Sequence, residues 1–132
     1  MGDVGSGFLG LVFGLSACAA SLHGGPGLWS WGILLALFVV DSAVTLGRRV
    51  LRGERWWEAH RSHAYQRLAR RWSSHGRVSA AVAAVNVLWL LPLAWCAALW
   101  PALGPWLMLL ASAPLVLAVV RCGAGLPDQV AL

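Results

Sequence analysis

A single carboxylate set among glycines stands at the start of the chain, directly before an apolar stretch. Asp3 lies within the segment Gly2-Asp3-Val4-Gly5-Ser6. Glycines let a ligand approach the backbone closely, and a hard cation such as Mg2+ takes oxygen ligands that it shares with substrate phosphates. The segment therefore suits a magnesium-bound phosphate, with Asp3 as the metal ligand. On its own, one Asp in a glycine-rich segment is more simply a flexible tail, so this interpretation depends on residues further along.

A second set of chemically capable side chains lies in the middle of the chain, where histidines and arginines are dense. If residues 56–72 form a helix, one stripe of it carries His60, His63, Arg67 and Arg70. Arginine presents a planar fork that matches phosphate oxygens, and histidine moves protons near neutral pH. A solvated basic face that orients the chain would explain the arginines as well, but histidine contributes little to orientation. A zinc pair formed by the two histidines is a further option, although no Cys or carboxylate lies at a matching spacing.

Asp41 is a third candidate because it lies inside an apolar stretch. It precedes Leu46 by five residues, which is roughly 7–8 Å along a helix. An acidic residue within a membrane span suggests a functional or polar-lined position. Pairing with Arg48 or Arg49 explains it equally well, and the sequence leaves both interpretations open. Asn86, in a later apolar stretch, is expected to form an interhelical hydrogen bond.

The elements that must position these residues are membrane helices. Hydrophobic residues make up 59% of the 132 residues, charged residues only 11%, and the mean hydropathy is +0.70, which is too apolar for a water-soluble domain of this size. The apolar residues fall in four blocks, 7–22, 28–46, 78–100 and 106–120. A span takes about 20 residues, so the first and last blocks need flanking residues to cross. We predict one all-α, polytopic membrane domain over 1–132, with about four transmembrane helices in two hairpins.

The arginines predict the orientation of these helices. The chain has no lysine, and nine of its ten arginines lie between residues 48 and 77, whereas 24–27 and 101–105 carry no charge. Positive loops stay on the cytoplasmic side, so we expect the basic loop 47–77 and both termini to be cytoplasmic. Tryptophans flank the two uncharged connections, as an aromatic belt would: Trp29, Trp31, Trp100 and Trp106.

The remaining features exclude several other classes of site. Cys18, Cys96 and Cys122 lie far apart and form no CxxC pair, so we expect small core residues rather than a zinc site or a disulfide framework. A basic loop between two membrane helices faces anionic lipid or a phosphorylated substrate more simply than nucleic acid. The tail 123–132 is expected to be flexible.

Three stretches occur together in the order found in one enzyme family. Gly2-Asp3-Val4-Gly5-Ser6, running into an apolar helix, is similar to that family's GDxGS segment. Residues 41–49, with Gly53-Glu54 after them, are similar to its helix with a paired-arginine exit, and residues 59–67 resemble its histidine-rich cytoplasmic loop. From its start to about residue 86, the chain therefore resembles the C-terminal part of the polyprenyl-phosphate N-acetylhexosamine-1-phosphate transferases.

The resemblance implies a reaction in the bacterial inner (cytoplasmic) membrane. The phosphate of polyprenyl (undecaprenyl) phosphate attacks the sugar-linked phosphate of a UDP-N-acetylhexosamine, giving polyprenyl-diphospho-sugar and UMP and initiating a cell-envelope glycan. Mg2+ neutralises the diphosphate. Asp3, His60 and His63 would then be catalytic, with Asp3 also binding the metal. The substrate-binding residues would be Arg61, Arg67, Gly2, Gly5, Ser6 and Asp41.

Family members also carry an aspartate pair and uridine-binding residues upstream of the GDxGS segment. We therefore expect the chain to be a C-terminal fragment, inactive alone, whose partner is the missing N-terminal half. The sugar, the pathway and the oligomeric state stay open. The alternative is a small non-enzymatic four-helix membrane protein that binds anionic lipid or a partner through its basic loop. That alternative does not depend on Asp3, His60 or His63.

Overall fold

The computed structural model describes residues 3–53 and 64–125, and within these ranges the protein is helical and contains no strand. The elements in chain order are α1 (Asp3–Leu22), α2 (Leu28–Leu51), α3 (Ala64–Trp72), α4 (His75–Val85), the π-turn η1 (Asn86–Leu90), α5 (Leu91–Leu99), the short 3-10 helix η2 (Pro101–Leu103) and α6 (Gly104–Arg121). The predicted all-α class is therefore confirmed.

Three stretches are long and apolar enough to cross a membrane. They are Leu28–Leu51, His75–Leu99 and Pro101–Arg121, while the apolar part of α1, Gly7–Leu22, is shorter. Large apolar side chains remain exposed along all of these helices, as expected where lipid rather than water surrounds a protein. The chain thus has the features of a membrane protein.

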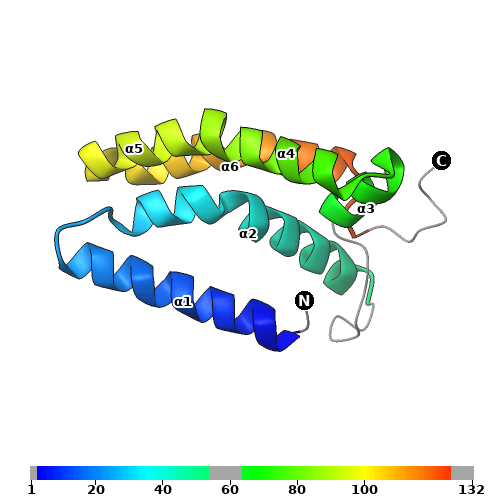
Figure 1. Cartoon of the computed structure of the whole chain (residues 1–132), viewed down its shortest axis with the longest axis horizontal. Coiled ribbons are helices and arrows are strands. Elements are labelled where there is room, and N and C mark those ends of the chain that lie inside the picture. The colour runs from blue at the N-terminus through cyan, green and yellow to red at the C-terminus, as the bar shows by residue number, and fades with distance from the viewer. Residues whose placement is uncertain (1–2, 54–63, 126–132) are drawn as a thin grey trace.

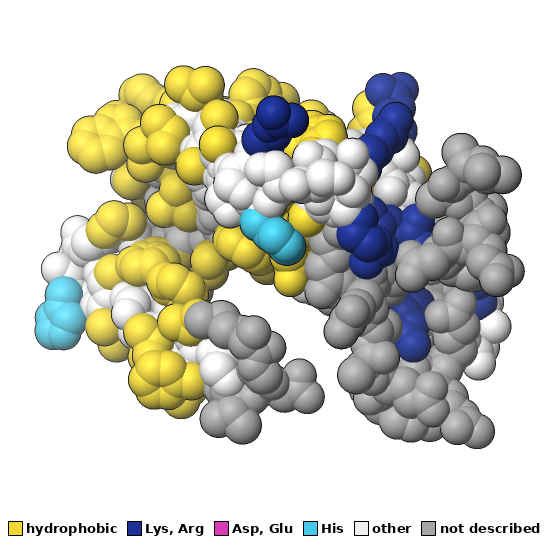
Figure 2. All heavy atoms as spheres, turned by 45° about the vertical axis from the view of Figure 1, so that its right-hand side comes forward, with side chains coloured by type: hydrophobic (Ala, Val, Ile, Leu, Met, Phe, Trp, Pro, Cys, Tyr) yellow, Lys and Arg dark blue, Asp and Glu magenta, His cyan; other side chains and the backbone are white. Residues whose placement is uncertain are grey.

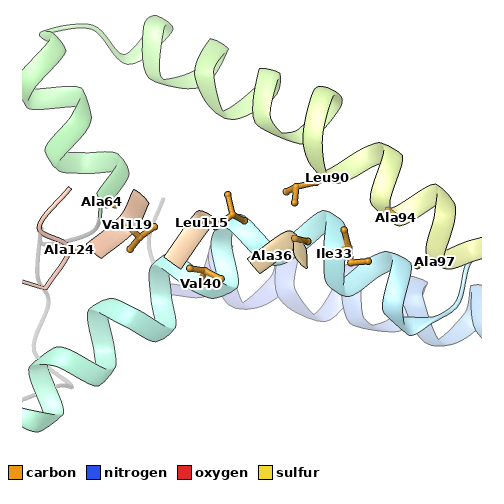
Figure 3. Packing of buried hydrophobic residues seen from close by; sticks show 11 residues of the cluster. Ile33, Ala36, Val40, Ala64, Leu90, Ala94, Ala97, Leu115, Val119 and Ala124 are labelled. Carbon is orange, nitrogen blue, oxygen red and sulfur yellow. The ribbon is translucent and has the colours of Figure 1, made fainter. Parts of the chain in front are cut away.

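The central helix is α2, which packs against α5 and α6 (Figure 1). Its buried side chains include Ile33, Ala36 and Val40, and they meet Leu90 of η1 and Leu115 of α6 (Figure 3). Alanines fill much of the rest of this core, and small side chains let membrane helices approach closely. Gly104 lies directly against α2, and an added Cβ there would collide with the indole of Trp29. α1 lies along α2 on the side away from α5 and α6 (Figure 1).

The first boundary that differs from expectation is the end of α2. The sequence suggested that the basic loop begins at residue 47, but α2 continues to Leu51 and carries Arg48 and Arg49 in its last turn. It ends where Gly53 adopts φ +68° and donates its N–H to the Val50 carbonyl, a left-handed terminus that glycine adopts without strain. Two arginines of the predicted loop therefore belong to the spanning helix itself.

The segment α4–η1–α5 forms one continuous rod with a π-turn in its middle. The Leu91 N–H donates to the Asn86 carbonyl five residues earlier, directly before Pro92, which lacks an N–H of its own. The Asn86 side chain donates to the Val82 carbonyl at 3.1 Å within its own helix. The expected interhelical bond from Asn86 is therefore wrong. A neighbouring tryptophan forms an interhelical hydrogen bond instead. Trp89 Nε1 donates to the Ala111 carbonyl of α6 at 3.4 Å.

Candidate functional site at the basic end of the bundle

The ends of α2 and α6, all of α3 and the start of α4 lie together at one end of the molecule (Figure 1). We call this the basic end, because the described arginines cluster there: Arg48, Arg49, Arg52, Arg67, Arg70, Arg71, Arg77 and Arg121. Figure 2 shows arginine side chains toward this end and hydrophobic side chains over the rest of the visible face. The N-terminal end of α1 points the same way (Figure 1).

Asp41 connects two distant parts of the basic end. Its Oδ1 accepts a hydrogen bond of 2.9 Å from the backbone N–H of Ala64, 23 residues later in the chain. The same oxygen accepts a second bond, 3.3 Å long, from the Thr45 hydroxyl. Ala64 is the first residue of α3 that the structure describes. Asp41, which is only 8% exposed, thus holds the start of α3 against α2.

One face of α2 continues this polar arrangement toward the helix end. Asp41, Thr45 and Arg49 follow at intervals of four residues, and all three are buried. On α3, Arg67 is also buried, at 8% exposure, whereas Arg70 is exposed. The sequence placed Arg67 on a solvated stripe open to the cytosol, and the structure instead places it on the inward face of α3. Burial of a guanidinium demands compensating partners, and Arg67 does interact with other groups of the protein.

A second connection joins the end of α6 to α2. Arg48 Nη1 donates to the Ala124 carbonyl at 2.8 Å, and Arg52 Nη1 donates to the Gly125 carbonyl at 2.7 Å. Gly125 has φ +72°, and a Cβ there would lie 3.0 Å from the Thr45 carbonyl oxygen. We call this contact the arginine clamp. Ala124 and Gly125, near the start of the predicted flexible tail 123–132, are therefore packed on α2, and 126–132 lie outside the described residues.

Sequence reasoning missed Ala124 and Gly125 as parts of the basic end. The signal that could have found them is the sequence Gly-Ala-Gly after the last apolar helix, because glycine is the usual residue directly after a helix C-terminus. Gly123 and Gly125 both adopt positive φ, and Ala124 between them is fully buried. Such burial is unlike a free tail.

Several predicted site residues cannot be compared with the structure. Gly2, His60, Arg61 and His63 lie outside the described residues. Asp3 and Ser6 are described only as backbone in the first turns of α1, and Gly5 is half-buried there. The convergence of Asp3 with the two histidines, and substrate binding by Asp41 and Arg67, stay predictions. The residue that follows His63 is nevertheless fixed, because Ala64 is bonded to Asp41.

Within residues 3–53 and 64–125, no group of three or more His, Cys, Asp and Glu could hold a metal ion. Cys18, Cys96 and Cys122 are free thiols. No protein-family model, curated protein or solved structure matches the chain. The resemblance to the transferase family therefore depends on the three motif stretches alone.

Proposed function

We propose that this chain is the C-terminal part of a polyprenyl-phosphate N-acetylhexosamine-1-phosphate transferase of the bacterial cytoplasmic membrane. Its four apolar helices would cross as two hairpins, with the basic end and both termini in the cytoplasm. The reaction would transfer a phospho-N-acetylhexosamine from a UDP-sugar to undecaprenyl phosphate and release UMP. The basic end would be the site of transfer.

The observation that carries this proposal is the hydrogen bond from the Ala64 N–H to Asp41. Asp41 begins the stretch similar to the family's paired-arginine helix, and Ala64 directly follows the histidines of the stretch similar to its cytoplasmic loop. A loop that only orients the protein needs charge but no fixed attachment of its histidine-containing segment. The buried Asp41 carboxylate fixes Ala64, the described residue next to the histidine-containing segment, and catalysis by positioned groups requires such fixed attachments.

In the proposed reaction the protein acts mainly by positioning and by charge stabilisation, as is general for phosphoryl transfer. Asp3 would contribute one carboxylate oxygen to Mg2+, whose role is to neutralise the diphosphate. His60, His63 and Arg61 would donate hydrogen bonds to the diphosphate or sugar at the loop. The remaining metal ligands would come from the substrate and from the aspartate pair that the family carries upstream of its GDxGS segment.

The test uses the chain co-expressed with a segment that supplies this aspartate pair, and measures UMP released from UDP-N-acetylhexosamine and undecaprenyl phosphate. The chain alone should release none, and the combination should show magnesium-dependent transfer. Asp3→Asn, His60→Ala and His63→Ala should each lower the rate about 10²–10³-fold, the usual effect of removing one transition-state-stabilising group. Arg121→Gln, an exposed arginine on α6, is the matched control and should change it little.

Unchanged rates in all three variants would refute the site. Absence of magnesium-dependent transfer in a combination whose two parts co-purify would refute the activity itself. The chain would then be a membrane protein whose basic end serves a non-enzymatic purpose.

A further inference from the structure

The turn between α3 and α4 is a tightly built corner of two residues. α3 ends at Trp72 and α4 begins at His75. Ser73 has φ +47° and donates its N–H to the Arg70 carbonyl, while the Ser74 hydroxyl caps α4 by accepting from the Arg77 N–H at 3.3 Å. Because the backbone reverses here, α3 lies across the end of α4 instead of extending it (Figures 1 and 3).

The side chains of α3 differ in exposure. Ala64, Arg67 and Ala69 are buried. Tyr65 and Trp72, seven residues apart and hence on the same side of the helix, are 51% and 40% exposed. Two aromatic side chains of this short helix are therefore exposed, and Trp72 lies at the corner.

Three exposed basic residues lie close to Trp72 in the sequence, on either side of the turn. We call Trp72 and these three residues the corner patch: Arg71, His75 and Arg77. Among the residues that the structure describes, no hydrogen bond or ion pair engages the Arg71 or Arg77 side chain. The sequence from residue 59 to residue 127 contains six arginines and not one Asp or Glu. The positive charge of the patch is thus not balanced by α3, α4, α5 or α6.

The position of the corner patch relative to the end of the apolar helix indicates whether hydrocarbon or lipid headgroups surround it. The span-length helix of this rod begins at His75, and its apolar stretch begins at Val78, so Trp72 and Arg77 both lie at the polar end of the span. In a bilayer, the end of an apolar span lies where hydrocarbon gives way to headgroups, a level that tryptophan prefers. Guanidinium groups at that level form charge-assisted hydrogen bonds with phosphate oxygens.

We propose that the corner patch binds the headgroup phosphate of an anionic phospholipid of the phosphatidylglycerol type. Arg71 and Arg77 would engage the phosphate, Trp72 would lie at the level of the glycerol, and α3 would thereby rest on the membrane surface. An anionic lipid is preferred over a zwitterionic one because the patch has no carboxylate to pair with a choline or ethanolamine cation. This site is independent of the proposed transferase activity, since it uses none of the predicted catalytic residues.

The test measures lipid binding by the purified chain in detergent, by native mass spectrometry, with phosphatidylglycerol and phosphatidylcholine titrated separately. Phosphatidylglycerol should bind more tightly. Each arginine near a membrane surface contributes about a fivefold gain in affinity for anionic lipid, so Arg71→Gln/Arg77→Gln should weaken it roughly 25-fold. Arg121→Gln, an exposed arginine at the same end but on α6, should leave it unchanged.

Equal binding of the two lipids, or an equal loss in the Arg121→Gln control, would overturn the proposal, because the binding would then be diffuse. Displacement of the lipid by millimolar inorganic phosphate would overturn it as well, since the patch would then bind a free phosphate. If the double variant does not fold, Arg71→Lys/Arg77→Lys keeps the charge and should retain most of the preference for phosphatidylglycerol.

A second measurement places the lipid at Trp72. In nanodiscs, the fluorescence lost on Trp72→Phe substitution is the Trp72 component, and phosphatidylglycerol brominated near the headgroup should quench it more than equally brominated phosphatidylcholine. Equal quenching by the two lipids would contradict a bound headgroup at the corner patch.

Discussion

The attachment of α3 to α2 through Asp41 makes a quantitative prediction. Asp41→Ala removes the acceptor of the 2.9 Å bond from Ala64 and of the 3.3 Å bond from Thr45. Leaving a buried donor unsatisfied costs about 1–3 kcal/mol. We expect α3 to lose about 2 kcal/mol of local stability, which corresponds to a roughly 30-fold increase in its opening equilibrium.

Hydrogen–deuterium exchange measured by mass spectrometry in nanodiscs separates this local effect from a global one. In Asp41→Ala, amides of α3 should exchange roughly 30-fold faster, while those of α5 should keep their rates. Asp41→Asn keeps an oxygen that can accept from Ala64, so its effect should be several times smaller. Thr45→Val removes only the longer bond and serves as the matched control, with a change of about 0.5–1 kcal/mol.

Two outcomes would refute the reasoning. Unchanged exchange in α3 of Asp41→Ala would mean that the carboxylate does not hold the helix. Equally accelerated exchange in α3 and α5 would mean that Asp41 stabilises the bundle as a whole and not the attachment of the loop.

Three further predictions concern packing and topology. Gly104→Ala should destabilise the protein in thermal melts by about 1–3 kcal/mol, as overpacking does, because the added Cβ would collide with the indole of Trp29. Gly32→Ala is the control and should be neutral in the same melts, because only Met108 atoms lie near the added Cβ, at 3.8 Å. Gly125→Ala should cost about 1–2 kcal/mol from its left-handed backbone and loosen the arginine clamp, seen as faster exchange at the end of α6. Cysteines introduced at Ser73 and at Gly25 should be labelled from opposite sides of the membrane, with residue 73 cytoplasmic, and labelling from one side would contradict the proposed hairpins.

The sequence predicted the helical class and the long spans because these depend on local composition. An apolar run of span length has few alternatives in a membrane, since every backbone group must be bonded within its own helix. Helix ends are less determined by composition. The end of α2 moved from residue 46 to Leu51 because arginine is a good helix former and the first residue that favours termination is Gly53.

The contacts of the basic end were harder to predict because they join residues far apart in the chain. For Asp41, the sequence left a functional role and an arginine pair open. The structure adds a partner that no side-chain pattern reveals, the backbone N–H of Ala64. For Arg67, periodicity placed it on one stripe with His60, His63 and Arg70, but it could not show that Arg67 is buried while Arg70 is exposed. Asn86 is bonded within its own helix because a carbonyl one turn back is always within reach.

The positive-inside rule treats arginines alike, yet the described arginines of the basic end fall into three environments. Arg49 and Arg67 are buried, Arg48 and Arg52 donate to the carbonyls after α6, and the others are exposed. At 0.1 M salt, interactions between exposed charges more than about 10 Å apart are largely screened, whereas interactions of buried and hydrogen-bonded charges are affected much less. Anion binding by the exposed group should therefore weaken as salt rises, whereas the arginine clamp and the inward face of α3 should persist. The arginines that are buried or hydrogen-bonded within the fold and the exposed arginines to which we assign anion binding are therefore different residues, which can be mutated separately.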